Sequence, residues 1–230
     1  MIARRVSELA GYPSSFPHLF GEVHGARDGA RPVPTDLMLT SAACHHLYPL
    51  IAATGATEDV CLSVDAMCYR GEATAEAGRL RSFHMYEIVR YGSATATDHW
   101  RDQALATAET TLRSLGLEVE RYPANDPFFG RTGKYLASAQ RSEHLKWELI
   151  AEVGDSTRQA IASVNYHKDH FGEAFGLRLT DGAGGHSACV AYGLDRILLA
   201  LRHRHGPRSD SWPASPRALL GLRVGDGPHS

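Results

Sequence analysis

The chain lacks long apolar runs, and this absence limits what it can be. No apolar stretch approaches the ~20 residues that cross a bilayer. The first residues contain two arginines but no apolar core of a signal peptide. Heptad repeats, internal repeats and low-complexity segments are also missing from the 230 residues. We therefore expect a cytoplasmic protein without a membrane partner.

The chain also lacks an excess of charge of one sign. Lysine and arginine total 24 against 26 aspartates and glutamates, so there is no net attraction to a nucleic-acid backbone. Basic residues cluster in Arg202-His203-Arg204-His205 with Arg208. Their position before Gly206-Pro207 suits cations at a helix C-terminus. Docking of an acidic partner protein is the alternative.

Cysteine is scarce and irregularly spaced, which fits a reducing compartment with a metal better than a disulfide framework. The four cysteines are Cys44, Cys61, Cys68 and Cys189. Cys61 and Cys68 are seven residues apart on an apolar stretch, and an odd separation places their side chains on opposite faces of a strand. We expect both in the core. Cys44 and Cys189, taken alone, would also be ordinary buried residues.

The apolar residues that are present, 43% of the chain, suffice for a sizeable core. Their pattern predicts helices near 2–10 and 41–53, a strand at 16–24, a Gly/Pro-rich loop at 25–35 and a strand hairpin over 59–91. Asp98 is expected to cap a helix that ends at Leu115, before Gly116. Further strands are expected at 117–122, 145–153 and 159–166. A final strand and helix follow, and residues 206–230 are expected to be mostly linker with a short apolar turn at 218–222.

Consecutive strands with short turns and few crossover helices predict an α+β fold with a mainly antiparallel sheet. The strand hairpin carries the first candidate site. One arm ends in Cys68-Tyr69-Arg70-Gly71-Glu72, and residues 79–87 form the other. In a regular strand Arg79, Phe83 and Glu87 would share one face, with Phe83 and Glu87 about 13 Å apart. On these residues alone, an ordinary exposed edge hairpin is the alternative.

A second motif covers residues 184–201. A glycine-rich turn leads into a strand and then a helix, whose expected apolar face is Leu194, Ile197, Leu198 and Leu201. Arg196 falls in the first turn of this helix. Because the helix dipole disfavours a cation there, its position indicates an anionic ligand.

These motifs, with the opening segment through Ser15-Phe16-Pro17-His18-Leu19, resemble the three signature motifs of class II aminoacyl-tRNA synthetases. Within that class the chain resembles the atypical zinc-dependent seryl-tRNA synthetases, and especially their shortened relatives, the amino acid:carrier protein ligases. The resemblance implies a class II catalytic domain over residues 1–205, a six- to seven-stranded sheet flanked by helices, and a homodimer. It also implies adenylation of a small amino acid of the glycine or alanine class, followed by transfer to the phosphopantetheine thiol of an acyl or peptidyl carrier protein.

The same resemblance implies roles for individual residues. It implies one zinc ion per chain, held by Cys44, Glu87 and Cys189. It assigns ATP binding to Arg70, Glu72, Arg79, Phe83 and Arg196. Of these, Arg70 and Arg196 are also assigned catalytic roles. Asp126 matches an aspartate that binds the substrate amino group, and Asn165 lies in a segment that lines the adenylate pocket.

Zinc is also favoured by the ligand chemistry. Two thiolates and one carboxylate leave one tetrahedral position open, and a neutral amine can fill it whereas an ammonium cannot. His45 and His46 adjoin Cys44, and one of them could ligate in place of Glu87.

Magnesium is expected with ATP, but its ligands stay open. Seryl-type enzymes carry an acidic residue six positions before the pocket asparagine, where this chain has Gln159. Glu148 is a candidate contributor.

Two other functions remain in view: tRNA aminoacylation by a minimal seryl-type enzyme, and a regulatory subunit without activity. The chain shows no coiled-coil arm that could bind tRNA, so no tRNA partner is expected. Its intact arginines argue against a regulatory subunit without activity.

Overall fold

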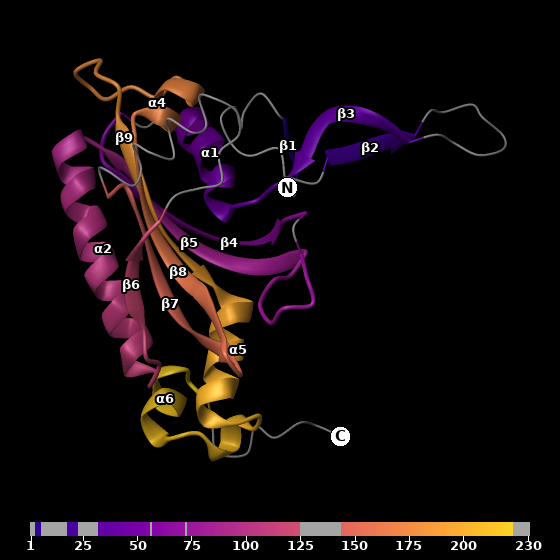
Figure 1. Ribbon diagram of the computed structural model, residues 1–230. Helices are drawn as coiled ribbons and strands as arrows, with labels where there is room; N and C mark the ends of the chain where they lie inside the picture. The colour runs from indigo at the N-terminus through magenta and orange to yellow at the C-terminus, as the bar shows by residue number, and fades with distance from the viewer. Residues whose placement is uncertain are drawn as a thin grey trace.

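The computed structural model describes residues 3–5, 18–22, 32–55, 57–71, 73–124 and 144–222. A six-stranded sheet, in the order β4-β5-β9-β8-β7-β6, forms the centre of the fold, and every neighbouring pair is antiparallel (Figure 1). Its strands are β4 (Val60–Tyr69), β5 (Ser82–Gly92), β6 (Glu120–Pro123), β7 (Lys146–Gly154), β8 (Thr157–Lys168) and β9 (His186–Gly193). The predicted α+β class and antiparallel sheet are confirmed.

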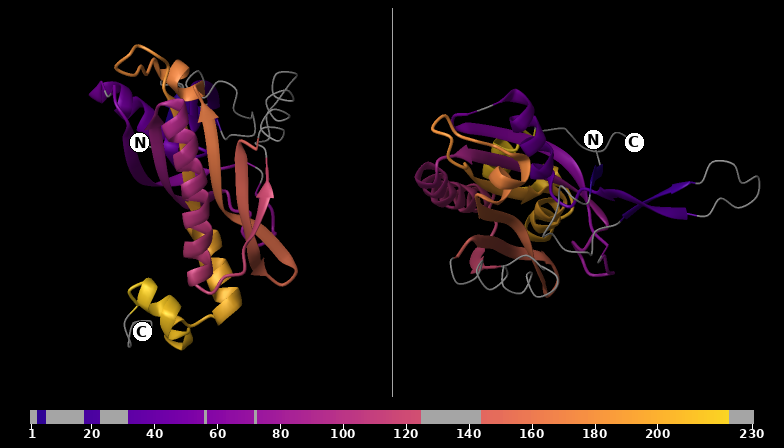
Figure 2. Two further views of the ribbon diagram at one scale, coloured as in Figure 1. Left: turned by 90° about the vertical axis from the view of Figure 1, so that its left-hand side faces the viewer. Right: turned by 90° about the horizontal axis from the view of Figure 1, so that it is seen from above.

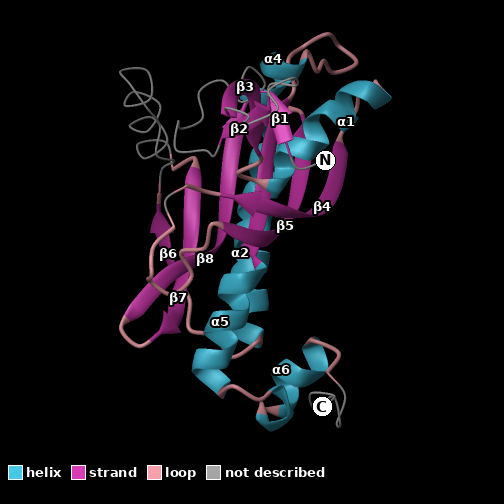
Figure 3. Ribbon diagram, turned by 90° about the vertical axis from the view of Figure 1, so that its right-hand side faces the viewer, coloured by secondary structure: helices cyan, strands magenta, loops and turns pink. Residues whose placement is uncertain are grey.

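The two faces of this sheet are covered differently (Figures 1 and 3). The long helices α2 (Ala94–Ser114) and α5 (Leu194–His205) pack on one face, and the main apolar core lies beneath them. The other face carries a short 3-10 helix η2 (Ala43–His46), α1 (Leu47–Thr54) and α4 (His170–Phe175) over a smaller core. Val190 belongs to the first core and Cys189 to the second, as the alternation of side chains along a strand requires.

A three-stranded sheet, ordered β1-β3-β2, is formed by β1 (Ala3–Arg5), β2 (His18–Glu22) and β3 (Pro32–Leu39). Its β2–β3 hairpin projects from the body of the molecule (Figure 2). The predicted strand at 16–24 is confirmed over its described part. The predicted helix near 2–10 is wrong at Ala3–Arg5, and the predicted loop at 25–35 ends early, because both segments pair with partners distant in sequence.

Several predicted boundaries move for local reasons. Ser93, not Asp98, caps α2, because its Oγ accepts a hydrogen bond from the Ala96 amide at 3.3 Å. Asp98 instead accepts from Arg101 at 2.7 Å. The strand expected at 117–122 begins at Glu120, and the helix α4 was not predicted at all.

The expected apolar face of the last helix is only half right. Leu201 is buried and Ile197 packs on the core, but Leu194 and Leu198 are exposed at 39% and 51%. Ala200, outside the expected set, is buried in their place. Asp195 and Arg196 in the first turn of α5 line an open pocket instead of a packed layer.

The cysteine expectations are also half right. The absence of bulges in the β4–β5 pairing confirms that Cys61 and Cys68 face opposite sides of the sheet. Cys68 is buried, but Cys61 is exposed because β4 is an edge strand.

The segment after α5 is more ordered than predicted. Residues 206–222 contain a 3-10 turn η3 (Ser209–Ser211) and α6 (Ala214–Leu219) where a linker was expected. Trp212 enters the main core, and its indole N–H donates to the Gly206 carbonyl at 2.9 Å. No helix in the described part of the chain is both long and apolar enough to span a bilayer.

We expect Trp212→Ala to lower the free energy of unfolding by about 3–5 kcal/mol, because it removes a large side chain from the core. Trp212 is 6% exposed, whereas Leu219 in the same segment is 59% exposed. Leu219→Ala is therefore the control and should change stability by less than about 0.5 kcal/mol. Urea denaturation measures the free energy of unfolding of both variants. If Trp212→Ala changed it as little as Leu219→Ala does, the segment would not contribute to the core.

Candidate active site

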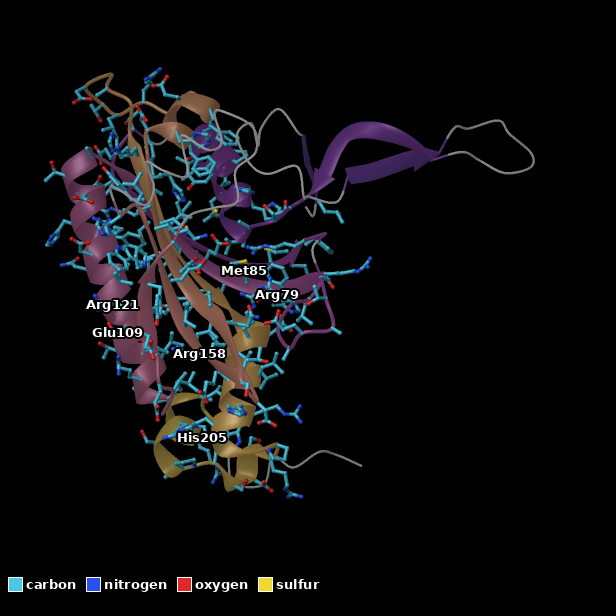
Figure 4. The ribbon with its side chains drawn as sticks, viewed as in Figure 1. Arg79, Met85, Glu109, Arg121, Arg158 and His205 are labelled. Carbon is cyan, nitrogen blue, oxygen red and sulfur yellow. The ribbon has the colours of Figure 1, made fainter. Side chains whose placement is uncertain are left out.

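The β4–β5 hairpin provides one wall of the candidate site. Alternation along β5 places Phe83, Met85 and Glu87 on the same face, as predicted. Arg79 does not share that face, because β5 begins only at Ser82. It lies in the loop that joins the two strands and pairs with Glu76 (Figure 4).

Three metal-ligating side chains converge beside this wall. β9 pairs with β5 so that Cys189 and Glu87 point to the same face of the sheet, and η2 brings Cys44 over them. One ligand atom from each residue, the sulfurs of Cys44 and Cys189 and a carboxylate oxygen of Glu87, lies within 4.8 Å of the others. All three side chains are buried. The group that forms in the described residues contains Glu87, and neither His45 nor His46.

The carboxylate of Glu87 is incompletely satisfied. Its Oε1 accepts a hydrogen bond from the Ala43 amide at 2.8 Å, while no described group hydrogen-bonds its buried Oε2. Burial, and then the nearby negative charge of Cys189, raise the pKa of Glu87 to about 8. A cation among these ligands would remove the penalty of burying this carboxylate.

The two sulfurs share a proton. A hydrogen bond to Cys189, together with burial, raises the pKa of Cys44 well above the usual thiol value. The same hydrogen bond holds the pKa of Cys189 well below it. Two sulfurs and one carboxylate oxygen are a ligand set that Zn²⁺ accepts, and the residues therefore fit the ion.

Two further side chains contact the Cys189 sulfur. The Asn165 amide nitrogen donates to it at 3.5 Å, and the imidazole Nε2 of His167 lies 3.7 Å from it. Asn165 was predicted in the adenylate pocket, whereas the structure places its amide at the sulfur. The sequence pattern did not single out His167, although it follows Asn165 by two residues on the same strand.

A cationic pocket lies next to these ligands, and it encloses about 570 Å³ including the space at its open mouth. The polar and aromatic side chains that line it are Arg70, Phe83, Lys146, Glu148, Ser163, Asp195 and Arg196.

The arginines of this pocket are held by the fold. The Arg70 guanidinium lies 5.3 Å from the centroid of the Phe83 ring. Arg196 donates to the carbonyls of Gly78 and Ala160, each at 2.8 Å. Burial, and then the charges of Arg70 and Arg79, lower the pKa of Arg196, which shows that positive charge is concentrated here. An anion would relieve that repulsion.

The remaining predicted residues separate into three groups. Glu72 and Asp126 lie outside the described residues. Gln159, which stands where an acidic residue was expected, donates to Glu76 at 2.9 Å, while Glu148 lines the pocket. The basic cluster at the end of α5 is occupied by local contacts: Arg204 donates to the Gly116 carbonyl, His205 contacts the Leu115 carbonyl and Arg208 pairs with Asp210.

Comparison with known proteins identifies the family. No protein-family model matches the chain. Two curated relatives from Bradyrhizobium diazoefficiens match it. Amino acid–[acyl-carrier-protein] ligase 2 is 38% identical, over 95% of this chain and 72% of the relative. Amino acid–[acyl-carrier-protein] ligase 1 is 35% identical, over 97% of this chain and 75% of the relative. The chain belongs to the amino acid–[acyl-carrier-protein] ligase family.

The fold of this ligase is that of a class II synthetase catalytic core. It superposes on M. kandleri SerRS, solved in complex with A. aeolicus tRNASec, with a TM-score of 0.76 and 17% sequence identity. That match covers 99% of this chain and 51% of the solved one, so the ligase spans about half the length of the synthetase.

The raised pKa of Glu87 predicts a pH effect on the metal-free ligase. The folded state binds this proton more tightly than the unfolded state, whose pKa is near 4.5. The free energy of unfolding of the wild type therefore exceeds that of Glu87→Gln by its full amount below pH ~4.5. This difference falls as pH rises through about 8. Urea unfolding in chelator at several pH values measures this difference, and a difference independent of pH would contradict the assignment.

Proposed function

We propose that this chain activates a small amino acid with ATP and transfers it to the phosphopantetheine thiol of a carrier protein. The observation that carries the proposal is the convergence of Cys44, Glu87 and Cys189 beside a pocket lined by Arg70 and Arg196. The names of the curated relatives support both halves of the reaction. We propose the glycine or alanine class as substrate.

Selection of the amino acid takes place at the three ligands. One zinc ion held by Cys44, Glu87 and Cys189 would offer its fourth position to the neutral α-amino group of the substrate. Asn165 is placed to assist, because its amide nitrogen is bound to the Cys189 sulfur while its buried Oδ1 has no partner among the described groups. This oxygen can accept an N–H of the amine. Met85 and Ala191 narrow the space next to the ligands, which favours a small side chain.

Activation takes place in the cationic pocket. A carboxylate oxygen of the amino acid attacks the α-phosphorus of ATP, the bond to the bridging oxygen breaks, and pyrophosphate leaves with the electron pair. Arg70 is positioned for the α-phosphate and Arg196 for the outer phosphates, and Phe83 offers its ring to adenine. Fixed guanidinium groups stabilise the charge that develops in this step more than they stabilise the bound substrate.

Transfer completes the reaction. The phosphopantetheine sulfur attacks the carbonyl carbon of the adenylate, AMP leaves, and a thioester remains on the carrier protein. We further propose that Glu148 contributes to magnesium binding and that the ligase acts as a homodimer.

ATP–pyrophosphate exchange with a panel of amino acids tests the proposal. We expect exchange with glycine or alanine and with no bulky amino acid. The activated amino acid should then appear on a carrier protein bearing phosphopantetheine, and not on the same carrier without it or on serine tRNA. Loading of the tRNA would indicate the synthetase reaction, and absence of exchange with every amino acid would indicate a regulatory subunit.

Arg196→Lys tests the role of the guanidinium in activation. We expect the turnover number of exchange to fall by roughly 10²–10³, with a smaller change in the KM for ATP, because lysine keeps the charge but loses the forked donors. Arg204→Lys, on the same helix but bound to the Gly116 carbonyl, is the matched control. A loss confined to KM would show that Arg196 only binds the nucleotide.

A further inference from the structure

We propose that His167 is a positioning residue for the metal ligand Cys189. Its Nε2–H donates to the Cys189 sulfur, which fixes the orientation of that ligand and withdraws part of its charge. The inference rests on the proposed zinc site and goes beyond it, because it adds to the three ligands a hydrogen-bonded chain that starts on α1.

The geometry places His167 between two different environments. Its Nε2 lies 3.7 Å from the Cys189 sulfur. Its Nδ1 lies 3.2 Å from the Ser187 hydroxyl and 3.3 Å from the Tyr48 hydroxyl, and the Tyr48 hydroxyl donates to Ser187 at 3.4 Å. Tyr48, Ser187 and Cys189 are all buried, so water competes little for these contacts.

These contacts favour one tautomer of the imidazole. A neutral imidazole has one N–H donor and one acceptor nitrogen. Tyr48 donates to Ser187, which leaves the Ser187 proton for Nδ1, so Nδ1 is the acceptor and Nε2 carries the hydrogen. The opposite tautomer would direct a lone pair at an electron-rich sulfur. Tyr48, Ser187, His167 and Cys189 thus form one directed chain of hydrogen bonds.

Aromatic packing holds the imidazole in place. The Tyr48 ring stacks on Phe171 with centroids 4.0 Å apart, and the His167 ring meets Phe171 edge-on at 4.9 Å. The imidazole cannot swing away from the sulfur without breaking these contacts. Partners of this kind orient metal ligands, and their loss typically weakens metal binding or activity by about 10–100-fold.

Two variants of similar size separate the donor from the ring. In His167→Gln the side-chain amide nitrogen can occupy the place of Nε2 and keep a donor at the sulfur. In His167→Asn the shorter amide reaches only the place of Nδ1 and leaves the sulfur without this donor. The zinc-loaded ligase is mixed with a competing chelator and zinc release is timed. The cobalt-substituted protein supplies the sulfur-to-cobalt absorption band, which reports the electron density on the thiolates.

We expect His167→Asn to release zinc about 10-fold faster or more and to shift the cobalt band, while His167→Gln stays close to wild type. His186→Asn is the matched control, since His186 contacts the Tyr166 hydroxyl at 2.6 Å and belongs to a different hydrogen-bonded pair. Thermal melts confirm that each variant folds.

The outcomes distinguish this inference from the proposed function. Equal behaviour of His167→Asn and His167→Gln, whether both keep or both lose the metal, overturns the positioning role while the zinc site stands. A wild-type protein that binds neither zinc nor cobalt overturns the zinc site itself, and the inference falls with it.

Discussion

The fold of this ligase depends on a carboxylate buried between two sulfurs. Burying Glu87 costs free energy, as the raised pKa of its carboxyl reflects, although Oε1 accepts a hydrogen bond from the Ala43 amide. A cation bound by the proposed ligands Cys44, Glu87 and Cys189 would make the arrangement favourable. The β5–β9 register, the position of η2 and the packing of α1 all serve to bring these side chains together.

The sheet separates stability from chemistry. On one face α2, α5 and the segment with Trp212 bury the main core and hold the strands rigid. On the other face the same strands carry Glu87 and Cys189, buried on the side covered by η2, α1 and α4, and Phe83, which lines the open pocket. Alternation of side chains along each strand links the two faces of the sheet. A shift of the β5 register by one residue would turn Glu87 toward the main core.

Strand alternation predicted that Phe83 and Glu87 share a face, and the motif placed Arg196 in a first helical turn. The grouping of Cys44, Glu87 and Cys189 was predictable only from the family resemblance, because no spacing connects the three. What could not be predicted depends on distant pairing. Arg79 lies outside β5 because the strand starts at Ser82, and Ala3–Arg5 is a strand because β3 lies beside it. The contacts of His167 with Tyr48 and Ser187 could not be predicted either, because no local pattern connects these residues.

The exposure of Cys61 has a practical consequence for handling the molecule. It is the exposed member of the four thiols, and it lies on the face of the sheet opposite Cys68, Glu87 and Cys189. A maleimide reagent in limiting amount would therefore attach there first. A dye or surface tether at this position would leave the catalytic face accessible, which suits single-molecule recording of carrier encounters.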